Sequence, residues 1–298
     1  MSGRQTYYRP NGLMEAVALL KRSAPRAVIV AGGTSISEQS LRNVEAVVDI
    51  SGLGLTRISF EGSCLRIGAS VTHQTLVEHE RLGVRSSEAL RIIGLGAAET
   101  SSDVRGRATV AGALVTADAA SPLVTVLLAC DADVVIAGAE DKTQAHPDPT
   151  HGFRVLPLAG FLAYRRKLLD TGVLITEVRL PLPSADTRGS YLRLPEEGAG
   201  FPLACAAASF AMRDGIVGNM RLALGGVAAL PIRLTRFEKG VEKKRLADWL
   251  DSELSAALAL LPPLAGEQPA QTQQRHRLAE QLARQALQAC LVQMQAME

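Results

Sequence analysis

The chain has 298 residues, of which 47% are hydrophobic and only 4% aromatic, so a large aliphatic core is predicted. Its formal net charge of +2 supplies no broad basic surface for nucleic acid and no polybasic patch for a membrane. The first residues, MSGRQTYYRPNG, lack the apolar stretch of a secretory signal, and no run approaches the roughly 18 apolar residues of a membrane span. These features argue against nucleic-acid and membrane partners and predict a cytoplasmic protein.

Helical and strand patterns alternate through the first part of the chain. In LMEAVALLKRS the apolar residues recur on one face of a helix, whereas short β-branched runs that end in Gly or Ser are typical of strands. The predicted elements are a helix at 13–23, strands at 26–31 and 46–50, a hairpin within 56–71, helices from 73 and from 88, a polar loop at 99–108, a segment of small residues at 109–121, a further helix, and a strand at 133–138.

A change of composition near residue 185 predicts a domain boundary. Prolines and polar residues predict a loop at 140–152, and residues 184–190 have the composition of a linker. Beyond it, three strands are predicted, with a hairpin turn at Asp214 and Gly215, and helices finish the chain. The predicted organisation is a first domain at 1–185, with subdomains at about 1–54 and 55–185, and a C-terminal domain at 186–298.

The stretch VIVAGGTSISEQS places two adjacent glycines and several hydroxyls after a predicted strand. Gly32 and Gly33 permit a backbone with positive φ, and successive amides in such a loop suit phosphate oxygens. Thr34, Ser35 and Ser37 could add hydroxyl donors. A tight turn with no ligand explains the same residues, and the loop matches neither GxGxxG nor a P-loop.

A second segment of small residues offers a similar surface about 80 residues further along. Thr109, Gly112, Thr116 and Ser121 combine hydroxyl groups with a glycine. Two loops of this kind predict a dinucleotide ligand, although close packing of small residues against a neighbouring element is the alternative.

Other candidate chemistry is weaker. The four cysteines have no CxxC spacing and are predicted to be small buried hydrophobes, and the five histidines show no metal-ligand spacing and are predicted at the surface. No metal site and no catalytic acid or base is assigned. The run YRRKLL at 164–169 indicates a solvated face or a partner contact, and the glutamates of LPEEG indicate an exposed loop.

Taken in order, these motifs resemble a known family over nearly the whole chain. They are AGGTS from 31, VVDIS from 47, LRIGASVTHQTL from 65, RGRATVAGALVTADAASPLVTVLLACDADVV from 105, ITEVRLPLP from 175 and MRLALGGVAALPIR from 220. In this order they resemble the FAD-binding medium subunit of molybdenum hydroxylases, the family of xanthine dehydrogenase and aerobic carbon monoxide dehydrogenase.

The resemblance implies an α+β fold: an FAD-binding fold of the vanillyl-alcohol-oxidase type with two α/β subdomains, followed by a three-stranded antiparallel sheet with helices. It also implies that two loops hold the FAD pyrophosphate. The cofactor-binding residues that it implies are Ala31, Gly32, Gly33, Thr34 and Ser35 in the first loop, Thr109, Val110, Ala111, Gly112 and Ala113 in the second, and Ser121, Tyr191 and Arg193 elsewhere.

In such a complex this subunit would pass electrons from iron–sulfur clusters through FAD to NAD or another acceptor. The implied partners are a molybdopterin-binding large subunit and an iron–sulfur small subunit, which carry molybdopterin and the 2Fe-2S clusters. The flavin would carry the redox chemistry, and the protein would position it.

The chain departs from the family pattern at several of these positions. Ala111 and Ala113 replace a glycine and an asparagine of the usual TxGGN loop, Pro122 replaces an aspartate, Ser35 replaces another aspartate, and Glu197 stands where a positive charge is expected. Two alternatives therefore stay open: a flavin-free or repurposed homologue that serves as a structural or assembly subunit or binds another ligand, and a freestanding flavoenzyme.

Overall fold

The computed structural model describes residues 5–23, 26–37, 41, 44–85, 89–138, 152–195, 202–245, 250–261 and 267–295. The chain forms two compact units, each assembled from separate stretches of sequence. Unit 1 comprises residues 1–73, 104–116 and 132–180, and unit 2 comprises residues 74–103, 117–131 and 181–298. Residues 74–103 and 117–131 thus pack with the C-terminal part, while the boundary near residue 185 stays a prediction.

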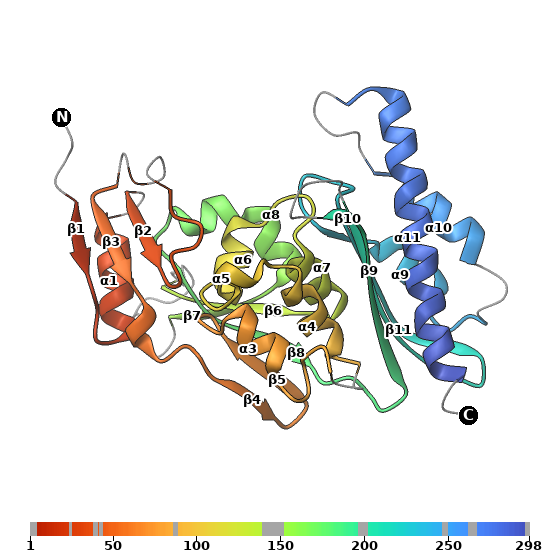
Figure 1. The fold of residues 1–298 in the computed structure, drawn as a ribbon, viewed down its shortest axis with the longest axis horizontal. Helices are drawn as coiled ribbons and strands as arrows, with labels where there is room; N and C mark the ends of the chain where they lie inside the picture. Colours follow the sequence, from red (N-terminus) through yellow and green to blue (C-terminus); the bar gives the residue numbers. More distant parts are fainter. Residues whose placement is uncertain are drawn as a thin grey trace, which may run out of the picture. The chain divides into compact units, whose positions relative to one another are not determined.

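A small parallel sheet begins unit 1 (Figure 1). Its strands are β1 (Thr6–Tyr8), β3 (Ala46–Asp49) and β2 (Ala27–Val30), in that order, and α1 (Leu13–Ser23) connects β1 to β2. The apolar face of α1, with Ala16, Val17 and Leu20, packs against Val48 and Ile50. Burial of this aliphatic stripe stabilises the helix, whose predicted bounds are confirmed.

A second sheet of five strands completes the framework of unit 1, in the order β4-β5-β8-β6-β7. Its strands are β4 (Ile58–Glu61), β5 (Cys64–Gly68), β6 (Asp133–Ala137), β7 (Phe153–Pro157) and β8 (Leu174–Pro181). Within unit 1, α6 (Val110–Thr116) and α8 (Leu158–Leu169) lie on its connections, whereas α3 (His73–Glu78) and α5 (Ser102–Arg105) each span a boundary between the two units in the sequence. The predicted hairpin at 56–71 is β4 and β5, the YRRKLL run lies on α8, and residues 140–151 of the loop predicted at 140–152 fall outside the described residues.

Unit 2 is built on an antiparallel sheet in the order β12-β11-β10-β9. Its elements are β9 (Thr187–Pro195), β10 (Pro202–Arg213), β11 (Ile216–Gly225), β12 (Ile232–Arg233), α4 (Arg91–Ala98), α7 (Pro122–Ala129), α9 (Thr235–Val241), α10 (Leu250–Leu258) and α11 (Pro269–Gln295). The three long strands match the prediction, and their turn at Asp214 and Gly215 has positive φ at both residues. Two details differ: β12 adds a short fourth strand, and β9 begins inside the predicted linker.

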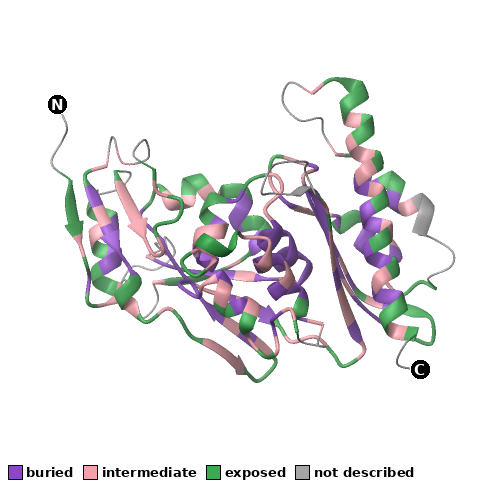
Figure 2. Cartoon of the chain, in the orientation of Figure 1, coloured by how far each residue is buried: buried purple, intermediate pink, exposed green. Residues whose placement is uncertain are grey.

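Helices cover both faces of this sheet. The long helix α11 lies along β9 and β10, while α7 contacts β10 and β11 (Figure 1). Every residue of α7 is buried (Figure 2), which explains why its sequence PLVTVLLA is almost entirely apolar. The core of unit 2 therefore lies on both sides of a single sheet.

Candidate cofactor-binding site

The first predicted loop, Ala31–Ser35, leaves the end of β2, and its two glycines have different structural reasons. A Cβ atom on Gly32 would lie 1.6 Å from the carbonyl oxygen of Arg107, so only glycine fits there. Gly33 has φ +69° and has open space where a side chain would stand. Gly32 therefore brings the first loop against the chain just before the second, and Gly33 turns the backbone.

The amides of the first loop are uncommitted. Within the described residues, the backbone N–H groups of Gly32, Gly33, Thr34 and Ser35 make no hydrogen bond. Donors of this kind suit an anionic ligand, because successive amides at a turn form a concavity for phosphate oxygens.

The second predicted loop behaves differently, because its amides are used inside the protein. The N–H of Val110 donates to Val71 O at 2.9 Å, that of Ala111 to Ala69 O at 3.0 Å, and that of Gly112 to Thr109 Oγ1 at 3.1 Å. The N–H of Ala113 donates to Thr109 O at 2.9 Å. These bonds start α6 and fix it to the strand region before α3, so this loop offers a wall and not a set of free donors.

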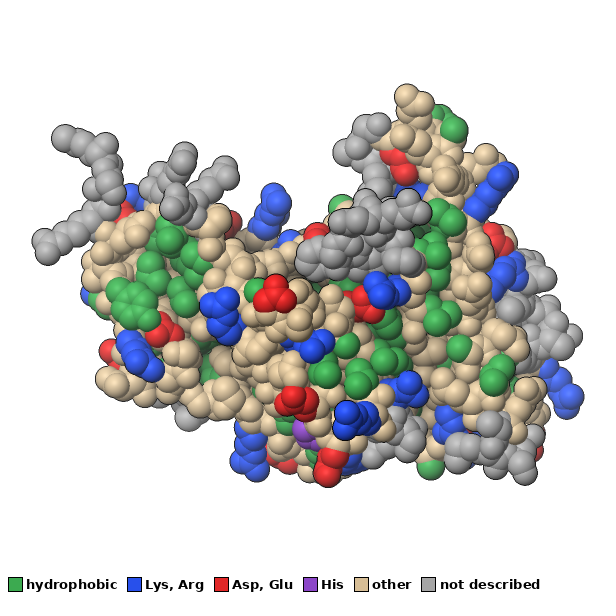
Figure 3. All heavy atoms as spheres, in the orientation of Figure 1, with side chains coloured by type: hydrophobic (Ala, Val, Ile, Leu, Met, Phe, Trp, Pro, Cys, Tyr) green, Lys and Arg blue, Asp and Glu red, His purple; other side chains and the backbone are tan. Residues whose placement is uncertain are grey.

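A cavity of about 290 Å³ within unit 1 joins the two loops. Thr109, Ala111 and Gly112 line it together with the whole first loop, and Val110 and Ala113 do not. The rest of its wall is largely apolar and comes from α1, β2, the end of α8 and the start of β8; it includes Leu20, Ile29, Ile50, Leu169, Val173 and Leu174. Hydrophobic side chains also reach the surface over the three-stranded sheet (Figure 3). Free amides at one end and apolar walls beside them fit a dinucleotide such as FAD.

The other predicted site residues belong to unit 2. Ser121 precedes α7, and its hydroxyl is hydrogen-bonded to Asp118 at 2.8 Å. On β9, the Arg193 guanidinium pairs with Glu99 at 3.1 Å, and burial raises the pKa of the Tyr191 hydroxyl. Glu197 lies outside the described residues. These positions stay predictions as cofactor contacts.

Sequence reasoning missed His73, which the prediction placed at the surface with the other histidines. The side chain is only 5% exposed, its backbone N–H donates to Ala108 O at 2.9 Å, and its ring is hydrogen-bonded to the backbone of Thr109. Next to it, Thr72 forms an isolated β-bridge with Thr109. His73 therefore positions the second loop, and no motif in the sequence marks it, because its burial depends on a segment more than 30 residues away.

Burial lowers the pKa of His73 to about 4 from an ordinary value of 6.5. Because the folded state favours the neutral ring, its stabilising effect is complete above pH 6.5 and is lost as the pH falls toward 4. We expect the free energy of unfolding to drop by up to about 3 kcal/mol over this range on account of this residue. Urea unfolding of the wild type and of His73→Gln between pH 4 and 7.5 measures it, and the variant should show a flatter profile.

An identical slope in the wild type and in His73→Gln would contradict the assignment.

Among the described residues, no group of three or more His, Cys, Asp or Glu side chains is arranged to hold a metal ion. None of the helices resolved in them is both long and apolar enough to cross a membrane. Three of the four free cysteines are buried, as predicted, and Cys64 is half-buried.

A fold with two such loops on an apolar cavity is that of a cofactor-binding protein, and comparison with known families identifies the cofactor. Residues 3–183 match the family described as the FAD binding domain in molybdopterin dehydrogenase, and residues 190–290 match the CO dehydrogenase flavoprotein C-terminal domain. The chain belongs to this family of molybdopterin dehydrogenase flavoproteins. The sequence-based identification is confirmed.

Several curated proteins are similar over most of their length. The carbon monoxide dehydrogenase medium chain of Hydrogenophaga pseudoflava is 26% identical over 238 residues, covering 77% of each chain. The caffeine dehydrogenase subunit beta of Pseudomonas sp. CBB1 is 25% identical over 289 residues, covering 94% of this chain and 92% of that one. The Escherichia coli K12 protein YgfM is 27% identical over 236 residues, covering 79% of each.

Solved structures share the fold. The carbon monoxide dehydrogenase of Hydrogenophaga pseudoflava that lacks the Mo-pyranopterin moiety matches with a TM-score of 0.81 at 24% identity, covering 98% of this chain and 99% of that one. Quinoline 2-oxidoreductase from Pseudomonas putida 86 matches with a TM-score of 0.76 at 23% identity and 99% coverage of both. At these sequence identities the structural similarity shows a shared fold and nothing more. The predicted fold class is confirmed.

Proposed function

We propose that the chain is the FAD-binding electron-transfer subunit of a molybdenum hydroxylase complex, which passes electrons from iron–sulfur clusters through FAD to NAD or another acceptor. The observation that carries this proposal is the cavity of unit 1, where a loop with uncommitted amides meets apolar walls in a chain that matches both flavoprotein domains.

In this proposal the first loop holds the pyrophosphate. The amides of Gly32, Gly33, Thr34 and Ser35 would donate to phosphate oxygens, and the two hydroxyls add donors at the exposed rim. Thr109, Ala111 and Gly112 would close the opposite wall by contact. FAD, when bound, supplies the redox chemistry, and these residues bind and orient it.

The proposed partners are a molybdopterin-binding large subunit and an iron–sulfur small subunit. The names of the relatives support them, since two are a medium chain and a subunit beta of dehydrogenases. The scattered cysteines of this chain have no cluster-binding spacing, which supports placing the clusters on another subunit. We place the complex in the cytoplasm and assign it no nucleic acid.

The test measures flavin content and partners in one preparation. The chain, purified from its native source under mild conditions, should carry about one FAD per chain. It should copurify with a larger subunit that holds molybdenum and a smaller subunit that holds iron. Flavin bands that bleach when the organic substrate is added, and return with an electron acceptor, would support the electron path. A folded chain without flavin after incubation with excess FAD would contradict the proposal.

A second candidate function is a flavin-free relative that keeps the fold as a structural or assembly subunit. The engaged amides of the second loop favour it, together with Ala111, whose side chain is 8% exposed where the family has glycine. The same flavin measurement distinguishes the two. Substrate turnover by the isolated chain, with FAD and without metal centres, would instead indicate a freestanding flavoenzyme.

A further inference from the structure

A second cavity, of about 230 Å³, lies wholly within unit 2, where the end of α7 meets β10 and β11. Its apolar wall is formed by Leu90 and by the segment Pro181–Pro183. Its polar wall includes Asp131, Ser209, Asn219 and Arg221. No step of the proposed electron transfer uses this cavity.

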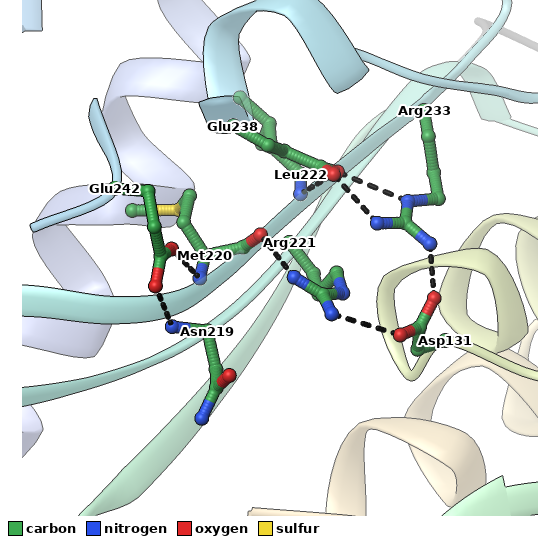
Figure 4. A network of polar contacts seen from close by, with 8 residues as sticks. All are labelled: Asp131, Asn219, Met220, Arg221, Leu222, Arg233, Glu238 and Glu242. Atoms are coloured by element: carbon green, nitrogen blue, oxygen red, sulfur yellow. Dashed lines mark hydrogen bonds and ion pairs between the residues drawn. The ribbon is translucent and has the colours of Figure 1, made fainter. Parts of the chain in front are cut away.

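Polar groups without partners converge on it. Ser209 and Arg221 face each other across β10 and β11, and Arg221 Nε is buried. Within the described residues, the Ser209 hydroxyl, Arg221 Nε and the side-chain amide of Asn219 make no hydrogen bond. Figure 4 shows the Asn219 side chain turned away from Glu242, which binds only its backbone N–H. Arg221 Nε is a buried donor without an acceptor, whereas the half-buried Ser209 hydroxyl and the exposed Asn219 amide face solvent and are free to bind a ligand.

The backbone around the cavity is shaped at two points. Asp131 and Asn219 both have positive φ, 57° and 55°, a left-handed conformation that Asp and Asn adopt more readily than other non-glycine residues. The pairing of β10 with β11 shifts between Ser209 and Ala211, which leaves a β-bulge that carries Asn219. Bulges redirect side chains near ligand sites, and here the bulge brings Asn219 to the rim of the cavity.

A chain of alternating charges leads to the cavity and ends there in a cation (Figure 4). Glu238 is 6% exposed and binds both Arg233 and the Leu222 N–H, so its carboxylate is fully engaged. Arg233 and Arg221 then share Asp131. Arg221 is the last residue in this series of charges, and its side chain is 28% exposed.

The Arg221 guanidinium also has N–H groups that are not hydrogen-bonded within the described residues. A guanidinium carries five N–H groups, of which one binds Asp131 at 2.8 Å and another Met220 O at 2.9 Å. The thiol of Cys130 lines the same cavity, and burial raises its pKa to about 12, so it is a neutral wall group and not a nucleophile. These features favour reversible binding of an acceptor group over covalent chemistry.

We infer that this cavity is a binding site for a small monocarboxylate with a compact apolar body. Its carboxylate would meet Arg221, Ser209 and Asn219, and its apolar body would lie against Leu90 and Pro181–Pro183. A charged, planar acceptor matches the guanidinium fork, and benzoate is a probe with such a carboxylate and a compact apolar body.

The test uses benzoate as probe and its neutral isostere benzamide as the matched ligand, titrated into the full chain by isothermal calorimetry at low salt. We expect saturable 1:1 binding of benzoate, with benzamide at least about tenfold weaker because it carries no charge. Arg221→Gln should weaken benzoate binding by a similar factor. Ser209→Leu, which fills the cavity and keeps every charged side chain, should abolish it.

The control is Arg213→Gln, which removes an exposed arginine on β10 that pairs with Asp186 and does not line the cavity. This variant should bind benzoate as the wild type does. Absence of benzoate binding to the wild type, equal binding of benzamide, or unchanged binding to Ser209→Leu would each overturn the inference. Ser209→Leu decides the matter even if Arg221→Gln fails to fold, and none of these measurements depends on FAD.

Discussion

Replacing Gly32 by alanine is expected to abolish FAD binding and to lower the free energy of unfolding by about 3 kcal/mol or more. The new methyl group would stand 1.6 Å from the carbonyl oxygen of Arg107, and backbone cannot rotate away as a flexible side chain can. The first loop would have to move away from the second, and the amides that line the cavity would move with it. Urea unfolding and a fluorescence titration with FAD measure the two effects.

Two neighbouring glycines make the experiment selective. Gly106→Ala changes the residue next to Arg107, where the structure has open space and no positive φ, so stability should change by no more than about 0.5 kcal/mol. Gly33→Ala should cost about 1 to 2 kcal/mol, because φ is +69° but nothing lies within 4 Å. If Gly32→Ala bound FAD like Gly106→Ala, the close approach of the two loops would not matter for the cofactor.

Replacing Glu238 by alanine should destabilise unit 2 by about 3 to 5 kcal/mol. Glu238 is 6% exposed and accepts hydrogen bonds from the Leu222 N–H and from the Arg233 guanidinium, whose side chain is only 17% exposed. Its loss would leave the buried Leu222 N–H and two N–H groups of Arg233 without their acceptor, while Arg233 keeps its pair with Asp131, and the cost of desolvating the unpaired donors would remain. Chemical denaturation followed by far-UV circular dichroism measures the change.

The control for this variant is Asp186→Asn, which breaks an ion pair whose arginine, Arg213, is 77% exposed. An exposed pair of this kind contributes less than about 1 kcal/mol. A similar loss of stability in both variants would contradict this expectation, because it would show that burial of the Glu238 network does not increase its contribution to the free energy of unfolding.

Local sequence patterns were sufficient for much of the fold. The apolar period of residues 13–23 predicted α1 to the residue, and Asp214–Gly215 predicted the hairpin between β10 and β11. The ordered motifs also identified the family. Each of these signals lies within a short window, where backbone preference and side-chain alternation act directly.

The sequence by itself also marked the two loops that form walls of the unit 1 cavity, since both combine glycine with hydroxyl side chains. It could not distinguish what each loop contributes. Only the tertiary structure decided that Gly32 is required by Arg107, that the amides of the second loop are engaged by Val71 O, Ala69 O and Thr109, and that His73 is buried. The same holds for the chain of charges from Glu238 to Arg221, which joins β11, α9 and the end of α7. These properties depend on contacts between residues that are far apart in the sequence. Such contacts set hydrogen bonding, burial and close approach, and the local order of residues does not encode them.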